Sequence, residues 1–165
     1  MPSLLHFCQW VYATHLSTSI RESAYAFPII EGIHTLGIAG VVGTVIVVDL
    51  RLLGIVMKRE PVSGIVRQVL PWTWAGFAVM FVTGLLLTIA EAATNYSNWA
   101  FRTKLILLLL VGINPLIFHL TIYRKVNTWD VAPVTPRRAR LAAISSLVLW
   151  SSIIVFGRLI AYVNT

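Results

Sequence analysis

Four histidines are the side chains of this sequence best suited to bind a metal, because a neutral imidazole is a common ligand of iron and copper. They are His6, His15, His34 and His119. His34 follows Glu31 at helical spacing. Gly37, Gly40 and Gly43 then remove side chains from the stretch after it. We expect that stretch either to pack tightly against a neighbouring helix or to leave room for a flat macrocycle beside His34.

The composition places these histidines in a membrane protein. Of the 165 residues, 58% are hydrophobic and only 12% are charged, whereas a soluble domain carries roughly 25% charged residues. The class of soluble enzymes is therefore excluded. The net charge of +7 comes from basic residues that lie between apolar runs, which indicates a membrane surface and not a nucleic-acid partner. Cys8 is the single cysteine, and no motif for covalent attachment of a c-type haem occurs.

Four apolar segments are long enough to cross a bilayer as helices, which takes about 20 residues. They cover approximately residues 27–50, 70–90, 100–123 and 141–163. The short connections predict antiparallel neighbours, so we expect an all-α transmembrane four-helix bundle that forms one domain, residues 1–165. Pro71 is expected in the first turn of the second helix, and Pro115 is expected to kink the third helix or to leave a carbonyl without its donor.

Residues 1–26 are predicted to form an amphipathic helix that lies in the membrane interface. One face of this helix carries five residues at helical spacing, namely Leu4, Phe7, Cys8, Val11 and His15. Trp10 and Tyr12 suit the headgroup region as aromatic anchors.

The distribution of basic residues predicts the orientation in the membrane. The first and third connections together carry nine Lys and Arg residues, and the remaining four lie toward the other side. We therefore expect a multi-pass protein of the bacterial inner membrane, with the two basic connections in the cytoplasm and both termini in the periplasm.

The depths of His34 and His119 predict two separate haem b sites. At a rise of 1.5 Å per residue, His34 lies about 10 Å and His119 roughly 25 Å from the periplasmic end of its helix. Two axial ligands of one iron cannot be about 15 Å apart in depth. His15 is the spare histidine nearest to the His34 site. His119 would have Met57 as a weak partner or hold a five-coordinate iron. In the alternative interpretation, His119 donates a hydrogen bond to Asp49 and binds nothing.

Three basic residues are expected beside the periplasmic haem. Arg102, Lys104 and Arg158 lie near that edge of the membrane, and a cation there needs an anionic partner such as a haem propionate. Glu91 is a second candidate partner for Arg158. The alternative for Arg158 is an ordinary position at the interface, with its charge extended toward the headgroups.

Two further chemistries compete with haem. Copper favours His, Met and Cys ligands, and a periplasmic copper site could be made from His6, Cys8, His15 and His34. A non-redox membrane subunit, in which the polar residues only hold the helices together, is the other alternative. The six acidic residues are too scattered for a di-iron centre.

The chain also resembles an uncharacterised family of small bacterial four-helix inner-membrane proteins. The resemblance covers nearly the whole chain and rests on these motifs: Glu22–Pro28, Glu31-x-x-His34-x-x-Gly37, Asp49–Gly54, Pro71–Phe77, Thr83-Gly84, Asn98-x-x-Phe101-x-x-Lys104, Asn114–His119 and Gly157–Tyr162. The family is similar in look to membrane b-type cytochromes and to copper-resistance membrane proteins. His34 and His119 fall on its motif positions, whereas His6 and His15 do not.

Together these observations predict a membrane b-type cytochrome with one or two haems. It would relay electrons across or within the inner membrane, alone or as a subunit of a redox complex, with quinone or a redox subunit as partner. Whether the protein is itself an enzyme stays open.

Overall fold

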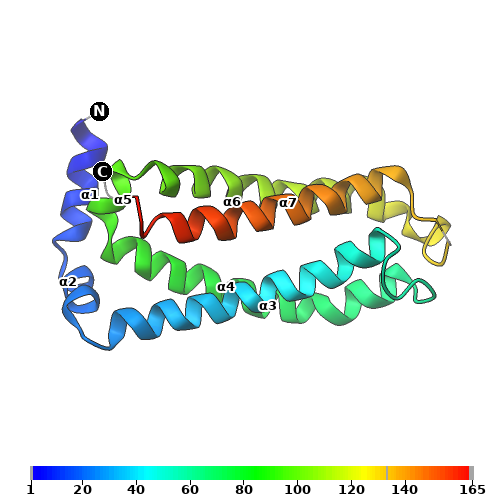
Figure 1. The fold of residues 1–165 in the computed structure, drawn as a ribbon, viewed down its shortest axis with the longest axis horizontal. Helices are drawn as coiled ribbons and strands as arrows, with labels where there is room; N and C mark the ends of the chain where they lie inside the picture. Colours follow the sequence, from blue (N-terminus) through cyan, green and yellow to red (C-terminus); the bar gives the residue numbers. More distant parts are fainter. Residues whose placement is uncertain (1, 133, 164–165) are drawn as a thin grey trace.

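The computed structural model describes residues 2–132 and 134–163, and within them every regular element is helical. Four long helices run side by side along the molecule (Figure 1), namely α3 (Ala26–Leu52), α4 (Val62–Ala90), α6 (Trp99–Ile117) and α7 (Arg137–Leu159). Each is long and apolar enough to cross a membrane, α6 together with its continuation to Thr128. The predicted all-α bundle with four membrane helices is confirmed. Residues 1 and 164–165 of the predicted domain lie outside the described residues.

The bundle consists of two antiparallel hairpins. α3 packs along α4, α6 packs along α7, and the hairpins are joined mainly by α3 and α7 (Figure 1). The short helices α1 (Pro2–Tyr12), α2 (His15–Glu22) and α5 (Ala92–Ser97) gather at one end, beside the last turn of α7. We call this the terminal end. The α3–α4 loop and the α6–α7 connection lie at the opposite end, which we call the loop end.

The interior contains two separate apolar clusters. The middle cluster joins all four long helices and consists of Val41, Met80, Val111, Trp150 and Ile153. The loop-end cluster consists of Leu52, Val62, Val66, Phe118, Val126, Trp129, Ala139 and Ala143. Many other large apolar side chains point outward, among them Leu36, which is 73% exposed, and Leu109, which is 65% exposed. An apolar exterior of this kind suits contact with lipid.

The start of α4 differs from the prediction. The helix begins at Val62 and not near residue 70, so Pro71 lies inside it and the predicted first-turn position is wrong. A distant loop explains the earlier start. The Asp130 carboxylate accepts hydrogen bonds from the Ser63 backbone N–H at 2.7 Å and from the Ser63 hydroxyl at 2.6 Å. This acceptor satisfies donors of the first turn, which otherwise have no partner within the helix.

The third membrane segment leaves α-helical geometry shortly after Pro115, the residue at which we expected a kink or a carbonyl without its donor. α6 ends at Ile117, and a π-helical turn (Phe118–Ile122) and a 3₁₀ helix (Tyr123–Thr128) continue it. Proline lacks a backbone donor and disturbs the hydrogen bonds of its helix. The wider turn that follows brings Phe118 into the loop-end cluster.

The N-terminal segment forms two helices and not one. The Thr14 hydroxyl donates to the Val11 carbonyl at 2.6 Å and accepts from the Ser17 N–H at 3.4 Å, so Thr14 caps α2 and ends the helical path of α1. His15 therefore does not continue the face of Leu4 and Val11. The Ser17 hydroxyl and Arg21 both donate to the Ala90 carbonyl, which fastens α2 to the end of α4.

The fourth membrane helix is shifted by four residues at each end, since α7 covers Arg137–Leu159 in place of 141–163. Asn98 holds its end at the terminal end of the molecule. Its side-chain oxygen accepts from the first backbone N–H groups of α6, and its amide donates to the carbonyls of Ile160 and Val163. This one residue ties the start of α6 to the end of α7.

Candidate functional site

His34 meets α4 in the half of the bundle nearer the terminal end. Its Nδ1 lies 2.9 Å from the Thr83 hydroxyl oxygen. The next residue of α4 is Gly84, and a Cβ atom built there would lie 2.9 Å from Cε1 of the imidazole. The missing side chain at Gly84 therefore makes room for the ring, while Thr83 holds its orientation.

The hydrogen bonds of Thr83 select the tautomer of His34. The hydroxyl of Thr83 donates its hydrogen to the Val79 carbonyl at 2.6 Å, and the Met80 carbonyl lies at 3.3 Å. A hydroxyl has one hydrogen, so the Thr83 oxygen acts as acceptor and Nδ1 of His34 as donor. A neutral ring protonated at Nδ1 has its lone pair on Nε2. The Met80 backbone is a further hydrogen-bond partner of the ring. No side-chain partner of Nε2 occurs in the described part of the chain.

Lys104 is a partly buried basic residue in the half of the bundle that contains His34. Its side chain extends from α6 toward α7, where the Cε and Nζ atoms lie 3.6 Å from the position of a Cβ at Gly157. The ammonium is close enough to act electrostatically on His34. Glu31 does so as well, from one turn earlier on α3. A Cβ at Gly157 would make ordinary van der Waals contact with Lys104, whereas one at Gly84 would collide with His34.

The other two basic residues expected near a haem are exposed at the terminal end. Arg102 is exposed and donates to the Tyr96 carbonyl at 2.6 and 3.1 Å, which holds it at the start of α6. Arg158 is exposed and stacks over the Tyr162 ring at 6.0 Å. This placement matches the alternative expected for Arg158, with its charge at the surface. Of the three predicted cations, Lys104 is the one that is partly buried.

His119 lies apart from His34, on the π-helical turn after α6. The residue is exposed, and its ring centroid is 4.9 Å from that of Tyr123 and 5.7 Å from that of Phe118. The alternative hydrogen bond from His119 to Asp49 is absent from the described residues. Met57, the expected weak partner of His119, is exposed in the α3–α4 loop with a φ of 49°.

His15 lies at the terminal end on α2, which packs against α3 and α4. Its ring is exposed, and Nδ1 is 3.3 Å from the Ser19 hydroxyl of the same helix. The described residues contain no group of three or more His, Cys, Asp or Glu side chains placed to hold a metal ion. The copper ligands suggested by the sequence, His6, Cys8, His15 and His34, are thus not assembled.

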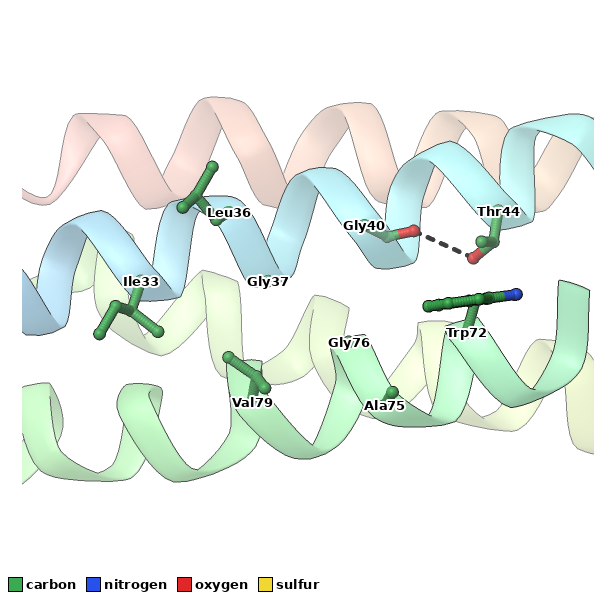
Figure 2. Close-up of a pocket in the computed structure, with 9 residues that line it drawn as sticks. All are labelled: Ile33, Leu36, Gly37, Gly40, Thr44, Trp72, Ala75, Gly76 and Val79. Atoms are coloured by element: carbon green, nitrogen blue, oxygen red, sulfur yellow. Dashed lines mark hydrogen bonds between the residues drawn. The ribbon is translucent and has the colours of Figure 1, made fainter.

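An apolar groove runs between α3 and α4 next to His34. Its volume is about 540 Å³, and Figure 2 shows the nine residues that line it: Ile33, Leu36, Gly37, Gly40, Thr44, Trp72, Ala75, Gly76 and Val79. Ile33 directly precedes His34, and Val79 lies one turn before Thr83. Gly37 packs closely, since a Cβ there would lie 3.2 Å from the Met80 nitrogen, whereas Gly40 faces open space. The structure thus shows tight packing at Gly37, and room beside Gly40 for a macrocycle stays a prediction.

Three residues of the site carried no predicted role. They are Thr83 and Gly84, which position the His34 ring, and Gly157, which lies beside the Lys104 side chain. Thr83, Gly84 and Gly157 did belong to the motifs of the family resemblance, which is the signal that could have pointed to them.

The fold is that of a small four-helix membrane protein in which the His34 imidazole of α3 is hydrogen-bonded to Thr83 of α4. A family of unknown function, DUF6644, matches residues 9–163, and the chain belongs to this family. The predicted resemblance to an uncharacterised membrane family is confirmed. No curated protein and no solved structure matches the chain.

Proposed function

We propose that this protein is a b-type cytochrome of the bacterial inner membrane, with His34 as an axial ligand of haem b. The observation that carries the proposal is the hydrogen bond from His34 Nδ1 to Thr83, because it leaves the Nε2 lone pair for iron. A ligating histidine usually donates its other ring N–H to a fixed acceptor, which orients the ring. The Thr83 hydroxyl plays that part here.

The residues around His34 suit the other needs of a haem. Lys104 places a positive charge within electrostatic reach of the imidazole, where a propionate would balance it. The adjoining groove between α3 and α4 is almost wholly apolar, as the faces of a macrocycle require. When bound, the haem would supply one-electron chemistry, and the chain would supply ligation, burial and charge pairing.

Haem is favoured over copper on the number of ligands. One imidazole is enough to attach a haem, whereas a copper site needs several of the His, Cys and Met side chains together. The described residues bring no such group together.

His15 is the proposed second axial ligand, because α2 packs against α3 at the same end of the bundle. The proposal includes electron exchange with a quinone or a redox subunit within the bilayer.

The second candidate is a non-redox membrane subunit. It is favoured by the Thr44–Thr73 pair, in which the two hydroxyl oxygens lie 2.8 Å apart and join α3 to α4 without any ligand. The His34–Thr83 contact would then be a second polar link of the same kind, worth about 1 kcal/mol.

Haem content separates the two candidates. We expect the purified protein to show a reduced-minus-oxidised haem b spectrum, and we expect His34→Ala to lose that haem. His119→Ala is the matched control, since His119 is exposed at the other end of the bundle. His15→Ala should change the spectrum if it is the second ligand. About two haems per chain, one of them lost in His119→Ala, would add the second site predicted from the sequence. Protein expressed with ample haem that shows no haem spectrum would overturn the cytochrome assignment.

A further inference from the structure

Asp49 is a buried carboxylate that the haem proposal does not use. The residue lies one turn before the end of α3 and is only 5% exposed. Its Oδ2 atom makes no hydrogen bond, and it is the buried side-chain polar atom without a partner in the described part of the chain. Such atoms are uncommon, because a buried polar group without a partner is destabilising, and more so when it is charged.

The surroundings of Asp49 form a thin polar layer between the two apolar clusters. Along α3, Val45 packs against the middle cluster and Leu52 belongs to the loop-end cluster, with Asp49 between them. The same order recurs on α7, where Ser146 lies between Ala143 and Trp150.

On α6, Asn114 lies between Val111 of the middle cluster and Phe118 of the loop-end cluster. Three helices therefore place one polar side chain each at the same level of the bundle.

Among the described residues no cation is paired with Asp49. Arg51 follows it by two residues in the chain and is itself 2% exposed. Its guanidinium donates to backbone carbonyls at the loop end instead, to Glu60 at 2.9 Å and to Asp130 at 3.5 Å. From α7 the group that faces Asp49 is the neutral Ser146 hydroxyl, and from α4 the nearby buried residues Val62 and Val66 are apolar. The amide of Asn114 on α6 is turned to the Ala142 carbonyl at 3.1 Å.

We propose that Asp49 is a proton-binding site inside the membrane, holding its proton while α3 and α7 are packed together. An ionised carboxylate between two apolar clusters and without a counter-charge would cost several kcal/mol. Protonation removes the charge and turns one oxygen into a donor. A metal ion is the poorer ligand for this site, because hard cations take six or more oxygens and the layer offers one carboxylate and one hydroxyl.

The direct test is reaction with dicyclohexylcarbodiimide, an apolar reagent that adds to protonated carboxyl groups within membranes. In the full-length protein we expect label on Asp49, located by mass spectrometry, and we expect the labelled fraction to fall as the pH is raised. Asp49→Asn should remove this label. Asp130→Asn is the control, since that carboxylate is hydrogen-bonded to Ser63 at the loop end and should not affect labelling of Asp49.

A second measurement keeps the test independent of reagent access. The infrared spectrum should contain the carbonyl band of a protonated carboxylic acid, and Asp49→Asn should remove it while Asp130→Asn retains it. Asn resembles the neutral acid, so Asp49→Asn should fold and should lose less thermal stability at high pH than the wild type. Absence of both label and band in folded protein would overturn the proposal. So would protection of Asp49 from the reagent by Na⁺ or K⁺ at constant pH, which would indicate a cation site.

Discussion

At His34, the single hydrogen of a neighbouring hydroxyl determines what the imidazole can bind. Thr83 gives that hydrogen to the Val79 carbonyl, so His34 must donate from Nδ1, and Nε2 becomes the atom that can accept. The ring keeps this position because Gly84 has no side chain. Two residues of another helix thus set the position of the His34 ring.

The first prediction concerns Gly84→Ala. The new methyl group would lie 2.9 Å from Cε1 of His34, so the imidazole must move and its bond to Thr83 should be lost. The ring is the end of a side chain and can move, so we expect a change in the free energy of unfolding of less than about 1 kcal/mol. Nitrogen-15 NMR of labelled histidine should show the Nδ1-protonated tautomer in the wild type and a mixture in the variant.

Haem content should fall together with this tautomer signal. Gly112→Ala on α6 is the control, because nothing lies within 4 Å of its added Cβ. An unchanged His34 signal in Gly84→Ala would contradict the described packing, whether or not the protein binds haem.

At the scale of elements, α3 and α4 are joined along a seam, which we define as the His34–Thr83 pair, the Thr44–Thr73 pair and the close approach of the two backbones between these pairs. His34 meets Thr83 toward the terminal end and Thr44 meets Thr73 toward the loop end. Between these pairs the two backbones approach at Gly37 and Gly76. Small residues at such crossings allow close van der Waals contact, which drives association of helices in lipid.

The second prediction tests this seam with two glycines of the same helix. In Gly37→Ala the added Cβ would lie 3.2 Å from the Met80 nitrogen and 3.4 Å from the Gly76 carbonyl oxygen, and a backbone cannot easily give way. We expect a loss of about 1–3 kcal/mol in the free energy of unfolding. Gly40→Ala has open space around its Cβ and should be neutral or more stable by about 0.5–1 kcal/mol. Unfolding in mixed micelles measures both, and equal stabilities would refute the close approach.

At the scale of the whole molecule, charge is unevenly divided between the two ends. Nine of the thirteen Lys and Arg residues lie in the last turn of α3, the α3–α4 loop, the first turns of α4, the α6–α7 connection and the first turn of α7. Figure 1 shows these segments together at the loop end. The structure therefore places the basic residues on one side of the bundle, opposite α1 and α2. Connections rich in Lys and Arg stay on the cytoplasmic side during insertion.

The third prediction is the orientation that follows from this charge. In a Cys8→Ser background, a membrane-impermeant maleimide added outside the cell membrane should label Ser97→Cys and leave Arg59→Cys unlabelled. Both positions are exposed in the fold, one at each end, so access to the reagent depends on the side of the membrane. Permeabilised membranes provide the control, in which both should react. Label on position 59 alone in intact membranes would reverse the topology.

The four spans could be predicted from the sequence because the thickness of a bilayer sets a length that an apolar run must reach. Their ends could be predicted less well, since they depend on contacts from distant parts of the chain. Asp130 caps α4 across a long separation in sequence, and Thr14 breaks the N-terminal segment through its own hydroxyl. Hydropathy contains no information on either contact.

For the candidate site, the sequence by itself determined that His34 lies in a membrane helix with glycines after it, and that Lys104 lies near the same edge. Hydropathy and the rise of a helix are enough for that, because both depend only on residues close in the chain. The packing of the helices sets the contact of Thr83 with His34, the exposed positions of Arg102 and Arg158, and the burial of Asp49 between two apolar clusters with its Oδ2 unpaired. These facts depend on how each helix is rotated about its axis, and that rotation is set by side chains of other helices.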